Sequence, residues 1–211
     1  MSRGSFSAFL IHLHPRFIPE SSSRVRFTWC MGGLAFWLFL LEVFTGALLL
    51  LYYIPTASLA YTSVQSISYV VTYGFFVRNL HYWCGQLMIV AVALHLIRVF
   101  LTGSFAPPRH LNWLIGLMLL VATLFVDFTG YLLVWDDRGL CAWTIARNLT
   151  QTVPVAGPLM ANLLFGPQEV GNLALVRVYA WHVILLPGFL IITMLWHFWK
   201  IRRDGSISQP L

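Results

Sequence analysis

Apolar residues fill four long stretches of the chain, and more polar segments separate them. The stretches cover residues 28–53, 80–102, 111–135 and 175–201. An α-helix needs about 20 apolar residues to cross the hydrocarbon core of a bilayer, and each stretch is long enough. Pro55 follows the first stretch and Pro107 the second, as expected of helix ends. The pattern predicts an all-α integral membrane protein with four spanning helices.

The polar segments divide the chain into three parts. Residues 1–27 mix arginine with phenylalanine and leucine, which is typical of an amphipathic segment on a membrane surface. Residues 28–203 hold the four predicted spans, and residues 204–211 form a cytoplasmic tail. The long loop at 136–172 is rich in Pro, Gly and Asn, and a loop of this length in a compact domain is usually functional.

Composition supports a membrane protein and excludes other classes. Of the 211 residues, 59% are hydrophobic and 9% charged, which is too apolar for a soluble domain of this size. The net charge of +6 comes from basic residues that flank the spans without forming a patch, so no nucleic-acid partner is expected. Cys30, Cys84 and Cys141 form no Cys-x-x-Cys motif, which argues against a disulfide framework or a zinc site.

The basic residues also predict the orientation in the membrane. Four spans place both termini on one side, and that side carries nine arginines and lysines against four on the other. Cytoplasmic segments are enriched in Lys and Arg, so both termini are expected in the cytoplasm. The nine are Arg3, Arg16, Arg24, Arg26, Arg98, Arg109, Lys200, Arg202 and Arg203, and the four are Arg78, Arg138, Arg147 and Arg177.

Two of the predicted helices carry a histidine near each end. Thirteen residues separate His81 from His95, and fourteen separate His182 from His197. These spacings fall ~40° short of whole helical turns and ~60° past them, so each pair leaves its helix on roughly one face. The two helices run in the same direction. His81 is therefore expected level with His182 near the outer side, and His95 level with His197 near the inner side.

Four histidines at hydrocarbon depth are costly and usually functional. A lone histidine in a helix is more often a hydrogen-bonded core residue, but that interpretation leaves the paired spacing unexplained. Two imidazoles at each of two levels are the ligands of two stacked bis-histidine haems held between helices. The sequence thus predicts a four-helix bundle that binds two haem b groups.

Glycines and arginines accompany the histidines. Gly33 and Gly46 stand thirteen apart in the first predicted helix, and Gly116 and Gly130 stand fourteen apart in the third. Glycine lets a flat ligand approach closely, although ordinary helix packing uses it too. An arginine lies within five residues of three histidines, where it would pair with a haem propionate or reach the membrane interface. These arginines are Arg78, Arg98 and Arg177.

Three further residues are unusual inside spans. Glu42 and Asp127 are carboxylic acids at hydrocarbon depth, where each is expected to be protonated or paired. They would handle protons or shift the potential of the adjacent haem, unless each is a neutral side chain hydrogen-bonded to a neighbouring helix. Pro187 lies between His182 and His197 and predicts a local helix distortion that absorbs the extra residue of spacing.

Together these motifs resemble the cytochrome b family in its split, b6-type form, over residues 24–211. The fourteen residues between the second histidine pair are the b6-like count, whereas mitochondrial-type members have thirteen. The residues that carry the resemblance are Cys30-Met31-Gly32-Gly33, Gly46, Arg78-x-x-His81, His95-x-x-Arg98, Leu101-Thr102-Gly103, Pro108-Arg109, Thr129-Gly130-Tyr131, Trp135-Asp136, Arg177-x-Tyr179-x-x-His182 and His197.

The resemblance implies a core subunit of a quinol-oxidising complex of the bc or b6f type. One haem would accept an electron from quinol near the outer face, and the other would pass it to a quinone near the inner face. The implied partners are a three-helix companion like subunit IV, a Rieske-like iron–sulfur protein and a c-type cytochrome, in a homodimeric complex of a bacterial inner membrane. The chain departs from the family at Val134, usually proline, at Asp127, usually glycine, and at Glu42, glutamine in the b6 form.

Cys30 begins the first span at the level of the inner haem. The resemblance implies that it attaches a third haem, of c type, through one thioether, because the family does so from a cysteine in this Cys-x-Gly-Gly context. A cysteine with no second cysteine nearby is otherwise an ordinary small apolar residue.

Two other functions stay open. In one, the same dihaem module is the quinone-linked membrane subunit of a different respiratory dehydrogenase or reductase. In the other, the bundle binds no haem and is a structural anchor or transporter. A visible spectrum separates the haem-free function from the rest. Neighbouring genes for a companion subunit and a Rieske protein would separate the two haem-binding functions.

Overall fold

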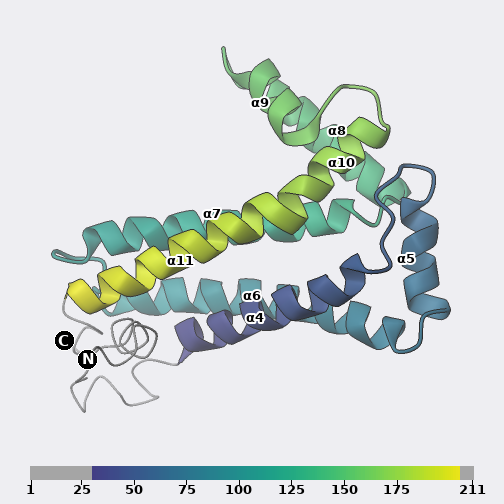
Figure 1. Ribbon diagram of the computed structural model, residues 1–211. Helices are drawn as coiled ribbons and strands as arrows, with labels where there is room; N and C mark the ends of the chain where they lie inside the picture. The colour runs from purple at the N-terminus through teal and green to yellow at the C-terminus, as the bar shows by residue number, and fades with distance from the viewer. Residues whose placement is uncertain (1–29, 205–211) are drawn as a thin grey trace, which may run out of the picture. The chain divides into compact units, whose positions relative to one another are not determined.

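The computed structural model describes residues 30–204, which form helices joined by turns (Figure 1). No strand occurs within this range, so the predicted all-α class is confirmed. The predicted surface segment at 1–27 and nearly all of the tail lie outside the described residues. The helices are α4 (Met31–Leu50), α5 (Ala60–Tyr69), α6 (Gly74–Leu101), α7 (His110–Leu132), α8 (Asp137–Gln151), α9 (Gly157–Phe165), α10 (Asn172–Ala180) and α11 (Leu186–Arg203).

Four of these helical stretches are long and apolar enough to cross a membrane. They are α4, α6, α7 and the continuous stretch Asn172–Arg203, which joins α10 to α11. Each contains most of one stretch predicted from hydropathy. Helix α6 begins at Gly74, earlier than the predicted residue 80, because the apolar residues that follow Gly74 extend its first turn.

A π-helical turn, η1 (Trp181–Leu185), joins α10 to α11. The N–H of Leu186 bonds to the carbonyl of Trp181, five residues back. Pro187 follows and has no N–H to continue an α-helical ladder. A π-turn accommodates one extra residue in a helix, so the distortion predicted between the two histidines of this span is present.

The chain divides into two compact units. Unit 1 comprises Leu87–Thr123 with the described parts of Met1–Leu38 and Phe189–Leu211, and unit 2 comprises Phe39–Gln86 and Leu124–Gly188. Each spanning stretch contributes residues to both units. His95 and His197 belong to unit 1, and His81 and His182 to unit 2. Each unit thus holds one of the two predicted histidine pairs.

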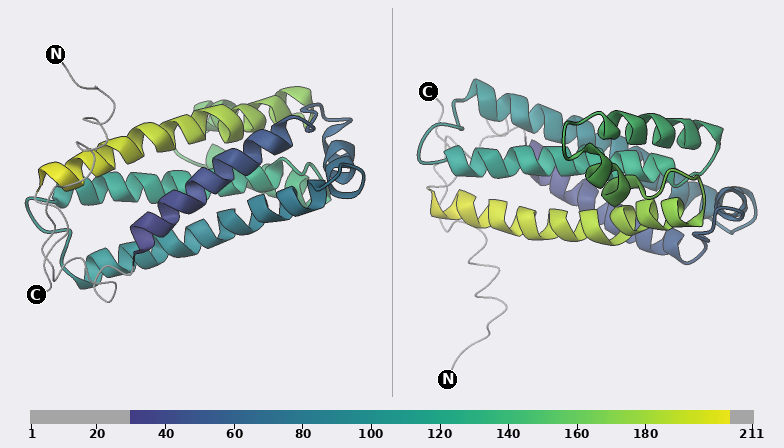
Figure 2. Two further views of the ribbon diagram at one scale, coloured as in Figure 1. Left: turned by 60° about the horizontal axis from the view of Figure 1, so that its bottom comes forward. Right: turned by 90° about the horizontal axis from the view of Figure 1, so that it is seen from above.

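The core of unit 2 lies where the spans meet the short helices. Helix α8 packs on α9, and α9 on α10 (Figure 2). Trp143 of α8 is 1% exposed, and its indole N–H donates to the carbonyl of Phe165 at 3.2 Å. Asp136 caps α8 by accepting from the N–H of Gly139 at 2.8 Å. The buried cluster is Ala60, Leu132, Trp135, Trp143, Phe165, Ala174, Leu175 and Val178.

Candidate functional site

In unit 2 the imidazoles of His81 and His182 lie next to each other in an edge-to-face arrangement. Their ring centroids are 6.2 Å apart and their planes are inclined by 80°. His81 comes from α6, and His182 from η1. The sequence predicted these two residues to be level, and the structure brings them together.

Two acceptors contact Nδ1 of His81. Thr45 Oγ1 and Glu42 Oε2 each lie 2.9 Å from this nitrogen. The Thr45 hydroxyl donates its own hydrogen to the carbonyl of Leu41 at 2.7 Å, so its oxygen accepts from the imidazole. Nδ1 therefore carries the hydrogen, and Nε2 keeps a lone pair for a metal.

The same assignment follows for His182. Its Nδ1 lies 2.9 Å from the carbonyl of Val126 and 3.2 Å from Oγ1 of Thr129. A carbonyl oxygen only accepts, and the Thr129 hydroxyl donates to that same carbonyl at 2.9 Å. Nδ1 of His182 is therefore the donor, and Nε2 is the free ligand atom.

This geometry fits a metal held between the two rings. Imidazole–metal bonds of roughly 2 Å on opposite sides of one ion, with each ring centre about 1 Å behind its nitrogen, place two ring centroids about 6 Å apart. The observed 6.2 Å agrees. Two imidazoles leave the other positions around a metal for a planar cofactor, so unit 2 fits a bis-histidine haem.

A glycine lies against each ring of this pair. A Cβ on Gly46 would lie 3.3 Å from Cε1 of His81, and one on Gly130 only 2.7 Å from Cε1 of His182. In both helices the preceding residue is the threonine that contacts Nδ1. The sequence predicted the glycines at these positions, but not Thr45 and Thr129 as partners of the histidines. The signal that would have found them is the Thr-Gly pair that both helices share.

Unit 1 repeats the glycine arrangement with one difference from expectation. A Cβ on Gly32 would lie 3.2 Å from Cε1 of His95, and one on Gly116 3.6 Å from Cε1 of His197. By contrast, a Cβ on Gly33 would meet nothing within 4 Å among the described atoms. The structure therefore places Gly32, where the sequence suggested Gly33, against the histidine. The spacing from Gly32 to Gly46 is fourteen, the same as from Gly116 to Gly130.

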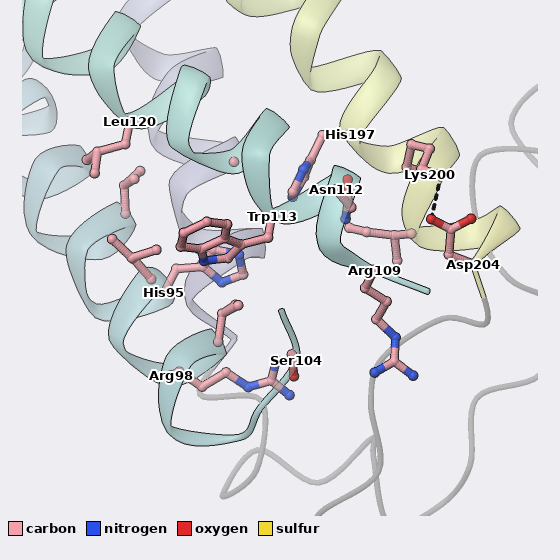
Figure 3. Close-up of a pocket in the computed structure, with 15 residues that line it drawn as sticks. His95, Arg98, Ser104, Arg109, Asn112, Trp113, Leu120, His197, Lys200 and Asp204 are labelled. Carbon is pink, nitrogen blue, oxygen red and sulfur yellow. Dashed lines mark ion pairs between the residues drawn. The ribbon is translucent and has the colours of Figure 1, made fainter. Parts of the chain in front are cut away.

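His95 and His197 line a cavity of ≈140 Å³ in unit 1 (Figure 3). One part of its wall is polar and basic, with the Lys200 ammonium paired to Asp204 at 2.6 Å. Arg109 Nε, Asn112 Oδ1 and Trp113 Nε1 are buried with no hydrogen-bond partner among the described residues. Arg109 Nε and Trp113 Nε1 are donors, which an anionic acceptor such as a haem propionate would satisfy, whereas Asn112 Oδ1 is an acceptor and needs a donor. The polar lining is Arg98, Ser104, Arg109, Asn112, Trp113, Lys200 and Asp204.

The three predicted arginines have different surroundings. Arg98 is buried and lines the cavity beside His95. Arg78 donates to the Ser68 hydroxyl at 3.4 Å. Arg177 donates to the carbonyl of Asn162. Of the three, Arg98 alone lines the same cavity as predicted haem ligands, His95 and His197.

The two carboxylic acids have separate partners within unit 2. Glu42 contacts His81, whereas Asp127 accepts from the side-chain amide of Gln86 at 2.9 Å. Both acids lie beside Gly85, because a Cβ there would be 3.7 Å from Glu42 Oε1 and 3.5 Å from Asp127 Oδ1. Glu42 is therefore positioned to influence a ligand directly, and Asp127 is not.

Cys30 immediately precedes α4. It is exposed and has a φ of 50°. Gly32, which contacts the His95 ring, follows two residues later. The cysteine that the resemblance marks for haem attachment therefore stands next to a residue of the unit 1 site.

Comparison with known proteins identifies the family of the chain. The family model for cytochrome b/b6/petB matches residues 18–205. Cytochrome b6 of Prochlorothrix hollandica is 39% identical over 188 residues, which cover 89% of this chain and 84% of that one. Cytochrome b6 of Mastigocladus laminosus is 40% identical, with coverages of 89% and 87%.

A solved structure supports the fold. A chain of the structure described as "Hyperthermophilic respiratory Complex III" superposes with a TM-score of 0.75 at 23% identity over 85% of this chain. The match spans 48% of that chain, so this protein covers about half of its length. By its family match, its cytochrome b6 relatives and its fold, the chain belongs to the cytochrome b/b6 family.

Proposed function

We propose that the protein carries electrons across the membrane between quinol and quinone, as the core cytochrome b subunit of a quinol-oxidising complex of the bc or b6f type. The main support is the histidine pair of unit 2, whose rings lie 6.2 Å apart with both Nδ1 atoms hydrogen-bonded to acceptors. The cytochrome b6 relatives favour this function over that of a dehydrogenase subunit.

In this proposal His81 and His182 ligate one haem b through Nε2, and His95 and His197 ligate another. A bound haem supplies reversible one-electron chemistry. The threonines hold the unit 2 rings in the tautomer that presents Nε2. Gly46, Gly116 and Gly130 leave room at the ring edges, together with Gly32.

The basic wall of the unit 1 cavity suits the propionates of the haem proposed there. Arg98 and Arg109 present planar guanidinium groups, which pair well with carboxylates. Lys200 adds a third cation beside Asp204. In unit 2, Arg78 and Arg177 each donate one N–H to Ser68 or Asn162, and a guanidinium has five such donors, so the others stay open to a propionate.

Replacing a ligand tests the two haem sites. His81→Leu should remove one of two b-type signals from the redox difference spectrum and halve the extractable haem per protein. His110→Leu is the matched control, because His110 is an exposed histidine at the start of α7 and should leave both signals. Full occupancy of both haems in the His81→Leu protein would refute the assignment.

We also propose a third haem, of c type, attached to Cys30 by one thioether. The position of Cys30 beside Gly32 and the likeness to cytochrome b6 support it. After denaturing electrophoresis, peroxidase staining should mark this chain, because a thioether-linked haem stays bound while b haems dissociate. An unstained chain, or staining that survives Cys30→Ser, would contradict this attachment.

The proposed partners are those of a quinol-oxidising complex. They are a three-helix companion subunit, a Rieske-like iron–sulfur protein and a c-type cytochrome, in a homodimeric assembly in a bacterial inner membrane with both termini in the cytoplasm. Purification from native membranes with identification of the co-purifying subunits tests this set. Recovery with dehydrogenase subunits alone would favour the other assembly.

A further inference from the structure

Glu42 is the carboxylate that contacts a proposed iron ligand. Its Oε2 lies 2.9 Å from Nδ1 of His81, and the two side chains are 15% and 23% exposed. Its other oxygen, Oε1, is buried and has no hydrogen-bond partner in the described part of the chain. His81 is therefore the hydrogen-bonding partner that the structure shows for this carboxyl group.

The facing ligand has a different environment. Nδ1 of His182 donates to the carbonyl of Val126 and lies near the Thr129 hydroxyl, and both are neutral acceptors. The other acid within a spanning helix of unit 2, Asp127, bonds to Gln86 instead of to a histidine. In unit 2 a carboxylate thus acts on one ligand of the pair and leaves the other with neutral partners.

We propose that Glu42 is a positioning residue that fixes the ring of His81 and lowers the midpoint potential of the haem that His81 ligates. A carboxylate that accepts the Nδ1 hydrogen of a metal-bound histidine sets its tautomer and makes the imidazole a stronger donor. Stronger donation stabilises the ferric state more than the ferrous state, because the ferric iron carries more positive charge. The inference rests on the proposed ligation of haem by His81.

Glutamine provides a close test of this role. Its amide has nearly the shape of the carboxyl group, and its carbonyl oxygen still accepts from Nδ1, but the interaction is weaker because the charge is lost. In Glu42→Gln the haem should therefore stay bound and titrate at a more positive potential. Thr45, the other acceptor at Nδ1, keeps the ring in place.

The experiment is a potentiometric titration of the b haems in the purified complex, with the His81→Leu protein identifying the signal to follow. Asp127→Asn is the matched control, since it neutralises a nearby carboxylate that contacts no ligand. We expect a positive shift of the His81 haem in Glu42→Gln, a smaller shift in Asp127→Asn, and no change in the haem of unit 1.

Equal shifts in the two variants, or an unchanged potential in a fully loaded Glu42→Gln protein, would overturn the inference. If Glu42→Gln does not assemble, Glu42→Asp keeps the charge but withdraws it from Nδ1. A positive shift of the same haem then supports the inference, and an unchanged potential refutes it. A parent protein without b-type signals would contradict the proposed function instead, so the two failures are distinguishable.

Discussion

A single absent methyl group determines how closely α7 approaches His182. A Cβ at Gly130 would lie 2.7 Å from the imidazole, far inside van der Waals contact, so Gly130→Ala must displace the ring. We expect this variant to lose the haem of unit 2 and keep that of unit 1. Haem content per protein and the redox difference spectrum measure this.

Gly33→Ala is the control for that substitution. Gly33 is an exposed helical glycine with nothing described within 4 Å of its Cβ position, so alanine should leave both haems bound. Equal haem loss in the two variants would mean that the glycine contact does not limit haem binding.

At the residue scale, the sequence predicted which histidines belong to the sites better than it predicted which residues contact them. Spacing singled out four histidines, because ligands on one helix face must recur at whole turns, and the structure brings the unit 2 pair together and places the unit 1 pair in one cavity wall. Spacing named Gly33 where the structure places Gly32, because neighbouring residues point about 100° apart and the choice depends on how α4 is rotated. The threonine partners were missed because a hydroxyl in a helix usually bonds to its own backbone, as Thr45 also does.

At the scale of elements, η1 predicts where the last span tolerates a deletion. Deleting Ile184, which is 64% exposed within the π-turn, should convert that turn to ordinary α-helix and leave the register on either side intact. Thirteen residues would then separate the two histidines, and both haems should remain. A spectrum of the purified deletion protein tests this.

Deleting Ile192 is the matched comparison. Ile192 is similarly exposed, at 71%, but lies in the regular α-helix of α11. Its loss rotates everything that follows by about 100°, so His197 should leave its site and the unit 1 haem should be lost. Two intact haems in this variant would show that the π-turn has no special tolerance.

Hydropathy located the spans, and Pro187 indicated a distortion in the last one. Neither signal gave the position of the π-turn. Pro187 suggested a break near itself, whereas the π-turn lies at Trp181–Leu185. The reason is that a proline leaves unpaired a carbonyl about one turn earlier, so the backbone adjusts before the ring. Helices α8 and α9 were predicted only as a long loop, because their apolar faces are short and pack within unit 2.

At the scale of the whole molecule, the spans bury little of their own surface. Only 17–22% of the residues in the most apolar part of each span are buried within the chain. Lipid can cover the remaining apolar side chains, and in the proposed function haem and partner subunits cover part of them. The cluster around Trp143 and Phe165 is different, because protein side chains alone complete it.

Haem starvation should therefore affect the chain unevenly. In membranes from cells blocked in haem synthesis, we expect hydrogen exchange to rise at the histidine-bearing parts of α6 and the last span. The Trp143 cluster should stay protected, since its buried contacts do not involve the proposed haems. Uniform protection with and without haem would show that the spans hold together without the cofactor.

The glycine contacts have a consequence for how such a domain arises. In both units a glycine of α4 meets a histidine of α6, and a glycine of α7 meets a histidine of the last span. The spanning region is thus two helical hairpins of one plan, each with a glycine-bearing helix followed by a histidine-bearing one. Two identical hairpins would together present four histidines and four glycines in the same arrangement. Duplication and fusion of a gene for one hairpin would therefore suffice to produce this spanning region.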